Sequence, residues 1–294
     1  MAIKTVQAII NGQTYNLTLN SSTGKYEATL TAPATSSFNL DDNAYPVTVK
    51  ATDMAGNEST VDNTDSSLGS KLLLKVKEKV APVISITAPT SGQLMAQNKP
   101  TIVFEVTDND SGVDLDTVVL KIDSSSVSGL THTEITDGYR FTYTPTSILD
   151  DGEHTITVTA SDNDGNAADA VSLTFRVLAT APNLSITNPA DGLWTNNATL
   201  AFSGTTDAST LTVQVGSGTA KNVSISDGAF SSTVTLSEGE NVLTFVATSA
   251  AGVTTTIERT VNLDTKPPVF TNVTLTPNPV DAGATYIISV ELSD

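Results

Sequence analysis

The sequence predicts an all-β protein made of small antiparallel β-sandwiches joined in a string. The first observation is a repeat, because an alternating strand followed by a glycine-containing turn occurs at residues 43–57, 152–166 and 239–253. The second is a succession of short segments in which apolar and polar residues alternate, with turn residues between them. The third is that no segment of the sequence shows the 3.6-residue apolar period of a helix.

The first region has turns that are easy to place. Asn11-Gly12 is the dipeptide favoured in type I′ turns, so strands are expected on both sides of it. Residues 62–69 are rich in Asp and Ser and are expected to form a loop. The strands expected in this region are residues 6–10, 14–19, 26–30, 47–51 and 72–76.

The second and third regions each contain a similar series of predicted strands. In the second region these are residues 83–87, 101–107, 117–122, 140–144, 155–160 and 171–177. In the third region they are residues 184–187, 199–203, 211–215, 230–236, 242–248 and 255–261. Short strands separated by turns in this way are typical of an antiparallel sandwich.

Proline-containing connectors divide the chain. They are Val80-Ala81-Pro82, Thr180-Ala181-Pro182 and Lys266-Pro267-Pro268. Because proline restricts both itself and the preceding residue, each connector is expected to be short and stiff, which favours an elongated rod. The predicted domains are residues 1–79, 80–178 and 179–264, followed by an incomplete β element at residues 265–294.

The incomplete element contains two predicted strands, which alone cannot bury a sandwich core. Three explanations stay open: a truncated chain, a frayed or partly ordered tail, and strands that complete a sheet of a protein partner. In the last case residues 265–294 bind by β-strand addition, in which main-chain hydrogen bonds supply the affinity.

Composition excludes several classes of partner. The chain has 294 residues, no cysteine and a net charge of −18. Nucleic acids and anionic membranes require a basic surface, so neither is an expected partner, and no apolar run is long enough for membrane insertion. The charge is explained either by the solubility of a long exposed rod or by a requirement for a divalent cation.

Several motifs resemble bacterial immunoglobulin-like (Big-type) repeats. They are Ala81-Pro82-Val83-Ile84-Ser85-Ile86, Asp108-Asn109-Asp110-Ser111-Gly112-Val113-Asp114, Asp162-Asn163-Asp164-Gly165-Asn166 and Asn188-Pro189-Ala190-Asp191-Gly192. The resemblance covers about residues 1–264 and implies tandem immunoglobulin-like sandwiches. Such repeats occur in bacteriophage tails and baseplates, in bacterial adhesins and beside bacterial glycosidases, so the resemblance implies the fold more strongly than the function.

The acidic loops of the second region are the candidate metal site. In an immunoglobulin-type sandwich the two loops that carry them share one end, and calcium takes six to eight oxygen ligands. The competing explanation is that Asp and Asn populate turns because their side chains replace backbone hydrogen bonds there. The calcium candidates are Asp108, Asp110, Asp114, Asp162 and Asp164, with Asp116 and Glu78 close by. No other cofactor is expected.

No catalytic residue is predicted. His154 occupies the position that Tyr45 has in the first repeat and Asn241 in the third, which is that of a tyrosine corner, a structural position. His132 is expected to be a solvated loop residue. With two histidines and no cysteine, transition-metal sites and thiol catalysis are nearly excluded.

Three aromatic residues are candidates for sugar binding. Trp194, the single tryptophan, follows a turn, and aromatic faces stack on sugars, although core packing is the competing explanation. Tyr139 and Tyr143 alternate with Phe141, and on that basis one exposed aromatic face is expected.

The predicted function is that of a non-enzymatic structural or adhesive component of a phage tail, baseplate or related contractile particle. It would decorate or space other parts and contact host-surface glycans. Residues 1–10 show no secretory signal, so assembly in the cytoplasm is expected, with the protein ending in a virion or extracellular particle. The alternative is a bacterial cell-surface adhesin or a carbohydrate-binding accessory module of a larger secreted enzyme.

Overall fold

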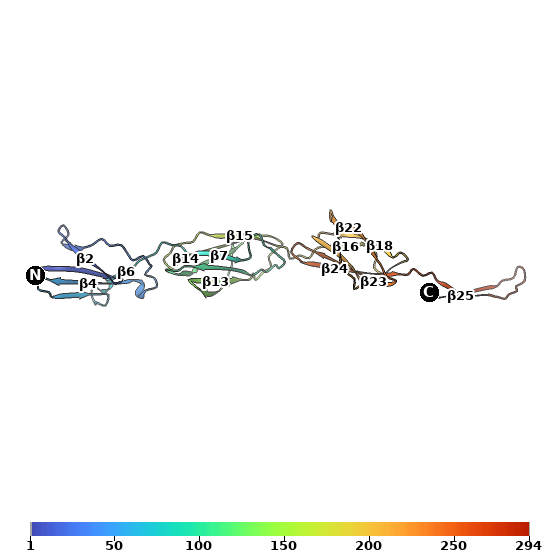
Figure 1. Ribbon diagram of the computed structural model, residues 1–294, viewed down its shortest axis with the longest axis horizontal. Coiled ribbons are helices and arrows are strands. Elements are labelled where there is room, and N and C mark those ends of the chain that lie inside the picture. The colour runs from blue at the N-terminus through green and yellow to red at the C-terminus, as the bar shows by residue number, and fades with distance from the viewer. Residues whose placement is uncertain (1, 294) are drawn as a thin grey trace. The chain divides into compact units, whose positions relative to one another are not determined.

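The computed structural model describes residues 2–293, and its regular secondary structure is almost entirely β-strand (Figure 1). The chain divides into two compact units, residues 1–93 with 99–176 and residues 94–98 with 177–294. Each unit is described by itself. Strand order confirms antiparallel sandwiches in tandem for the second and third regions, whereas the elongated rod and the limits of the domains stay predictions.

The first region forms one antiparallel sheet, in the order β3-β2-β1-β4-β5, with β6 paired to β4. Asn11 and Gly12 join β1 to β2 with φ values of 49° and 73°, which confirms the predicted type I′ turn. In place of the expected sandwich, the described residues of this region supply no second sheet. The elements are β1 (Ile3–Ile10), β2 (Gln13–Asn20), β3 (Lys25–Glu27), β4 (Tyr45–Asp53), β5 (Glu58–Val61) and β6 (Leu73–Leu74), with short 3-10 turns at Asp41–Asn43 and Gly69–Lys71.

The second region is a complete sandwich of two sheets, ordered β12-β13-β9-β7 and β11-β10-β14-β15-β8. Its core contains Phe104, which stacks on Phe141 with ring centroids 4.9 Å apart. The strands are β7 (Val83–Ala88), β8 (Leu94–Met95), β9 (Ile102–Thr107), β10 (Val113–Ile122), β11 (Ser125–Ser126), β12 (Thr131–Ile135), β13 (Gly138–Tyr143), β14 (Gly152–Asp162) and β15 (Val171–Val177).

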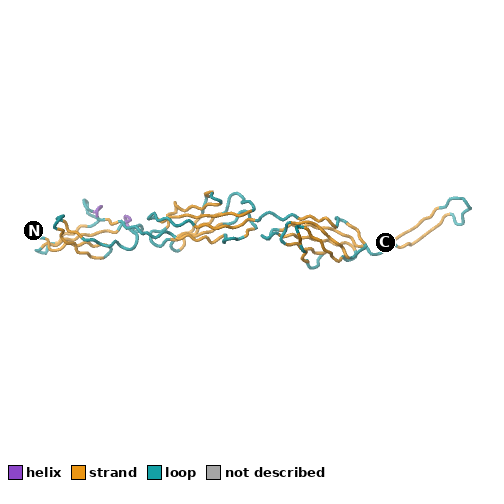
Figure 2. Tube along the Cα trace, turned by 90° about the horizontal axis from the view of Figure 1, so that it is seen from above, coloured by secondary structure: helices purple, strands orange, loops and turns teal. Residues whose placement is uncertain are grey.

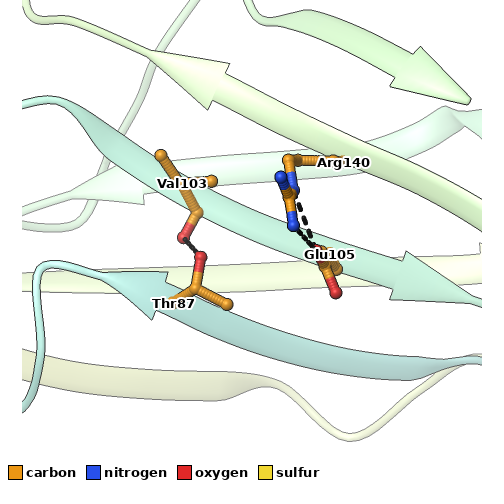
Figure 3. Close-up of polar contacts among 4 residues, drawn as sticks. All are labelled: Thr87, Val103, Glu105 and Arg140. Atoms are coloured by element: carbon orange, nitrogen blue, oxygen red, sulfur yellow. Dashed lines mark hydrogen bonds and ion pairs between the residues drawn. The ribbon is translucent and has the colours of Figure 1, made fainter. Parts of the chain in front are cut away.

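Polar pairs cross between strands on the outer face of this sandwich. Arg140 on β13 donates through Nε and Nη2 to Glu105 Oε1 on β9, at 2.8 and 2.6 Å (Figure 3). Thr87 Oγ1 donates to the Val103 carbonyl at 3.1 Å. Residues with this side-chain direction alternate with the buried ones, so each strand has one apolar and one polar face.

The third region repeats this arrangement, with sheets ordered β16-β18-β22-β21 and β17-β24-β23-β19-β20. At Gly204 a Cβ atom would lie 2.0 Å from the Ser185 carbonyl oxygen and 2.5 Å from a Phe230 ring carbon, so the close approach of β16 to β18 requires glycine. The strands are β16 (Leu184–Asn188), β17 (Leu193–Thr195), β18 (Thr199–Thr206), β19 (Thr210–Val215), β20 (Lys221–Val223), β21 (Ile225–Ser226), β22 (Ala229–Thr235), β23 (Gly239–Thr248) and β24 (Thr254–Leu263).

The last two strands, β25 (Val269–Thr276) and β26 (Ile287–Ser293), form a two-stranded antiparallel hairpin. Figure 2 shows them as a pair of strands joined by a loop. Every residue of both strands is exposed, and the hairpin pairs with no other described strand.

Comparison of strand orders shows what the first region lacks. The series β11-β10-β14-β15 in the second region matches β20-β19-β23-β24 in the third and β2-β1-β4-β5 in the first. The opposite layer begins with β7 and β9 in the second region and with β16 and β18 in the third. Among the described residues of the first sheet, these two strands have no counterpart.

Candidate functional site

The repeated corner position is structural in all three copies. The Tyr45 hydroxyl lies 2.6 Å from Thr35 Oγ1 and 3.3 Å from the Thr35 carbonyl oxygen. His154 Nε2 lies 2.8 Å from the Asp150 carbonyl oxygen, and Asn241 Nδ2 donates to the Ser237 carbonyl at 2.7 Å. Each side chain therefore bonds back to backbone upstream, which confirms the predicted corner.

His154 differs from the other two corners in carrying an ionisable ring. Burial opposes its charge, but the hydrogen bonds with the Asp150 carbonyl and the Asp123 carboxylate raise the pKa of His154 above its usual 6.5. Both ring nitrogens face acceptors, with Nδ1 2.6 Å from Asp123 Oδ2, so the doubly protonated ring satisfies both. Burial likewise opposes the charge of Asp123, while the hydrogen bond with His154 lowers its pKa.

The acidic loops meet where the first sheet joins the second sandwich. Glu78 of the connector, Asp108 after β9 and Asp162 at the end of β14 each offer a carboxylate oxygen, all within 4.8 Å of one another. Asp162 is buried, and the other two are half-buried. The sequence grouped Asp108 with Asp162 and placed Glu78 close by, and the structure brings these three together.

The three carboxylates of this cluster are also hydrogen-bond acceptors. Glu78 Oε1 accepts from the Ser111 backbone N–H at 2.7 Å, and Asp108 Oδ1 accepts from the Gly112 N–H at 2.7 Å. Asp162 accepts twice from Asn166, at 2.8 Å from its backbone N–H and at 2.6 Å from its side-chain amide. The cluster thus fixes the loops that contain it.

Two other predicted calcium ligands join the two domains directly. Asp110 accepts from the Ser36 backbone N–H with both carboxylate oxygens, at 2.9 and 3.0 Å. Asp164 Oδ2 accepts from the Glu78 backbone N–H at 2.9 Å, while Lys77 Nζ donates to the Asp164 carbonyl at 2.8 Å. Their side chains therefore serve as acceptors for backbone groups of the preceding domain.

The remaining candidate, Asp114, lies outside the cluster. It accepts from the Asp116 N–H at 3.1 Å in a local turn, as the competing explanation predicted for such residues. In the third sandwich Asp207, which follows β18 as Asp108 follows β9, accepts from the backbone and side chain of Asn183, both at 2.8 Å.

A divalent cation suits this donor set chemically, because calcium prefers carboxylate and carbonyl oxygens. Glu78, Asp108 and Asp162 would hold it. Each keeps lone pairs beyond those used in hydrogen bonds, and the buried Ser111 Oγ nearby in sequence makes no hydrogen bond. Calcium binding therefore stays a prediction. The predicted ligands are now Glu78, Asp108 and Asp162, and Asp114 is no longer among them.

The aromatic candidates separate into one exposed residue and two that face inward. Trp194 on β17 is 69% exposed, so the core-packing explanation is wrong for it. Tyr139, Phe141 and Tyr143 are two residues apart on β13 and share one face, so the expected exposed aromatic face was wrong. Tyr143 is buried, and half-buried Tyr139 packs edge-on against His132, which lies on β12 rather than in a loop.

Taken together, the sheet order and the inward-facing corners define a chain of tandem immunoglobulin-like domains. Residues 82–158 match the bacterial Ig domain family, and residues 182–265 match the family described as glucodextranase, domain B. Among the described residues, no helix is long and apolar enough to cross a membrane.

A curated relative and two solved structures show similarity to the chain. Bacillopeptidase F of Bacillus subtilis (strain 168) is 32% identical over 124 residues, which are 42% of this chain and 8% of that protein. The fibronectin(III)-like modules of Clostridium thermocellum CbhA align at 15% identity over 62% of this chain and 94% of theirs, with a TM-score of 0.36. A 1.5-MDa bacterial ice-binding adhesin aligns at 20% identity over 90% of this chain and 88% of the solved chain, with a TM-score of 0.37.

Proposed function

We propose that the chain is a non-enzymatic structural and adhesive module that spaces or attaches the parts of a larger protein or assembly. The observation that carries this proposal is the use of the acidic loops. The loops at the end of an immunoglobulin-like sandwich can form a ligand site. Here the carboxylates of Asp110 and Asp164 instead accept hydrogen bonds from backbone N–H groups of the preceding domain. These hydrogen bonds hold the second sandwich to the preceding domain.

The candidate catalytic groups have structural roles as well. His154 is tied to the Asp150 carbonyl and to Asp123, so it has no free nitrogen with which to act as a base. The acidic cluster holds its own loops. A glycosidase pair would need a cleft and one carboxyl group kept protonated by apolar surroundings, whereas the carboxylates of Glu78 and Asp108 accept hydrogen bonds from the backbone N–H groups of Ser111 and Gly112.

Two settings are proposed for such a module. The comparisons support an accessory module or surface adhesin, because the matches concern a domain named after a glucodextranase and a segment of Bacillopeptidase F. The phage tail, baseplate or contractile particle rests on the sequence alone. Residues 265–294 are proposed to make the attachment in either setting by β-strand addition to a protein partner.

Recovery of the native protein with its partners tests the proposal. We expect it to co-purify with a surface protein, a secreted enzyme or a particle, and to lack hydrolase activity on glycans and peptides. A glycan array with the Trp194→Ala variant as control tests the sugar contact. Hydrolytic activity that is lost on mutation of Asp108 or Asp162, in a variant that still folds, would overturn the non-enzymatic assignment.

A further inference from the structure

A cavity of about 380 Å³ lies beside the turn between β12 and β13 of the second sandwich. All but one of its lining residues belong to this sandwich, and the exception is Asn39 of the first region. The cavity is therefore formed by a complete two-sheet domain, and neither the first sheet nor the hairpin β25–β26 contributes a strand to it. Its polar lining residues are Asn39, Asp108, Ser111, Glu134, Asp137 and Asn163.

The two asparagines of the cavity already use their side-chain amides as donors. Asn39 Nδ2 donates to the Asp110 carbonyl at 2.6 Å, and Asn163 Nδ2 donates to the Ser111 carbonyl at 2.9 Å. No described residue donates to the Oδ1 atom of either asparagine. Each of them therefore offers a ligand a hydrogen-bond acceptor.

Three carboxylates line the same cavity without a cation beside them. The side chains of Glu134 and Asp137 make neither a hydrogen bond nor an ion pair with any described residue, and Asp108 accepts through Oδ1 alone. No lysine or arginine is among the lining residues. A ligand that complements this lining must supply several N–H donors and a positive charge.

Ser111 gives an observation that is independent of these carboxylates. Its backbone N–H donates to Glu78 Oε1, and its carbonyl accepts from Asn163 Nδ2. The residue is only 1% exposed, and its Oγ has no hydrogen-bond partner among the described residues. An unpaired hydroxyl in a buried position is unfavourable, and a ligand in the cavity that Ser111 lines would supply the partner.

The arrangement suits an extended organic cation rather than a metal ion. Among the described residues, the carboxylates within 4.8 Å of one another are those of Glu78, Asp108 and Asp162, and neither Glu134 nor Asp137 belongs to that group. The cavity volume of about 380 Å³ also far exceeds the space of about 30 Å³ that one water molecule takes in the liquid. Acceptors spread around such a space match the separate N–H groups of a guanidinium.

We propose that this cavity binds an arginine side chain of a protein partner. The guanidinium group donates to the carboxylates that line the cavity and to the Oδ1 atoms of the two asparagines. Arginine is favoured over lysine because its planar group carries five N–H donors and stacks on aromatic rings. The half-buried ring of Tyr139, which also lines the cavity, is the aromatic surface available for such stacking.

The arginine site goes beyond the attachment proposed for residues 265–294, because it lies in the second sandwich and uses side chains in place of strand addition. Glu134 and Asp137 also take no part in the hydrogen bonds that hold the junction, so they are available to a partner. The net charge of −18 favours the approach of a basic partner to the chain as a whole.

NMR titration of the isotope-labelled 294-residue chain tests the proposal. The peptide acetyl-glycyl-arginyl-glycinamide is expected to shift the backbone amides of Gly112 and Gly138, which line the cavity, in a saturable manner. The same peptide with citrulline has nearly the same shape but no charge, and we expect it to bind at least about tenfold more weakly. The titrations contain chelator, so that no divalent cation bridges the peptide to the carboxylates. Equal affinity of the two peptides would overturn the proposal.

Charge-removing variants locate the site. Glu134→Gln and Asp137→Asn break no side-chain hydrogen bond with a described residue, and each is expected to weaken binding of the arginine peptide about two- to fivefold. Asp116→Asn is the matched control, because this exposed aspartate lies on β10 outside the cavity and its replacement changes the net charge equally. If both cavity variants bind the peptide as tightly as the control, the cavity is not the site.

Ser111→Ala separates a role in binding from a role in folding. The variant removes a buried hydroxyl that has no described partner, so the free chain is expected to be at least as stable as the parent. Its affinity for the arginine peptide is expected to fall. A stability loss in the free chain together with unchanged affinity would show that the hydroxyl serves the fold and not the ligand, and would count against the site.

Two further ligands identify the source of the cation. Tighter binding of spermidine than of the arginine peptide would assign the cavity to a free polyamine and overturn the protein partner. Stronger shifts of the same amides by a methyl glucoside would assign it to a neutral sugar and overturn the cationic ligand. All of these titrations use the chain alone, so their failure leaves the structural and adhesive role to its own test by co-purification.

Discussion

Asp110 and Ser36, which are 74 positions apart in the sequence, are joined by a two-point hydrogen bond. Both carboxylate oxygens accept from one backbone N–H, at 2.9 and 3.0 Å. Ser36 is buried, so this N–H cannot be satisfied by water instead. The neighbouring Ser37 N–H donates to the Val76 carbonyl at 2.9 Å, which holds the connector to the same segment.

Removal of the Asp110 carboxylate is expected to destabilise the first region. Asp110→Ala leaves the buried Ser36 N–H without an acceptor, at a cost of about 1–3 kcal/mol in the free energy of unfolding. Urea denaturation and hydrogen exchange at the Ser36 amide measure this effect. Asp116→Ala is the control, because this nearby aspartate is exposed. Equal free energies of unfolding for the two variants would show that Asp110 does not stabilise the junction.

The stability of the second sandwich is expected to depend on pH through His154. Because the folded pKa of His154 is raised above 6.5, its contribution is full below pH 6.5 and is lost as the pH rises through the folded pKa. The pKa of Asp123 is lowered below 3.8, so its contribution is present above pH 3.8 and is lost as the pH falls through the folded value. Maximum stability is therefore expected between these limits.

His154→Asn tests the origin of this dependence. The third sandwich uses Asn241 at the same corner, so asparagine can keep the bond to upstream backbone while it removes the titrating ring. Urea denaturation between pH 5 and pH 9 should show the alkaline loss of stability in the parent protein and not in the variant. A parallel decline in both proteins would assign the pH dependence to other groups.

Calcium is expected to stabilise the junction if Glu78, Asp108 and Asp162 bind it. At a calcium concentration of about 100 times Kd, binding to the folded state adds about 2.7 kcal/mol to the free energy of unfolding. Melting curves with calcium and with chelator measure the shift. Asp108→Asn should reduce it, whereas Asp207→Asn in the third sandwich should not. Identical curves with calcium and chelator would end the calcium proposal.

Replacement of Trp194 is expected to leave stability nearly unchanged. The side chain is 69% exposed, so Trp194→Ala should change the free energy of unfolding by less than about 0.5 kcal/mol. Phe245→Ala in the core of the same sandwich is the contrast, with an expected loss of about 3–5 kcal/mol. Ready quenching of the single tryptophan's fluorescence by iodide would agree with this placement, and a protected, blue-shifted emission would contradict it.

Local patterns in the sequence were sufficient for features that depend on neighbouring residues. The Asn11-Gly12 turn follows from its dipeptide, and the corners at Tyr45, His154 and Asn241 follow from their shared place in the repeat. The buried alternation of β14 is equally visible in the sequence. All of these arise from short-range geometry, which the sequence records directly.

Features that depend on distant partners were harder to predict. The strands of the first region alternate like those of the other two, and no local pattern reveals that the described residues supply no opposite layer for their sheet. Asp110 and Asp164 have the residue type and loop position of calcium ligands, but their partners, Ser36 and the Glu78 N–H, lie 74 and 86 positions away. Tyr143 could have been assigned to the core by counting its two-residue spacing from Phe141.

The connector after β6 also has a mechanical consequence. Between Leu74 and Val83 it is held to the second sandwich by hydrogen bonds of Lys77 and Glu78 with Asp164, and by the bond of the Glu78 side chain with the Ser111 N–H. Tension along the chain would reach these bonds without having to open a sandwich core. Their release would lengthen the connector by at most about 3.3–3.6 Å for each residue freed. We therefore expect the connector to lengthen before a sandwich core opens when the chain is pulled.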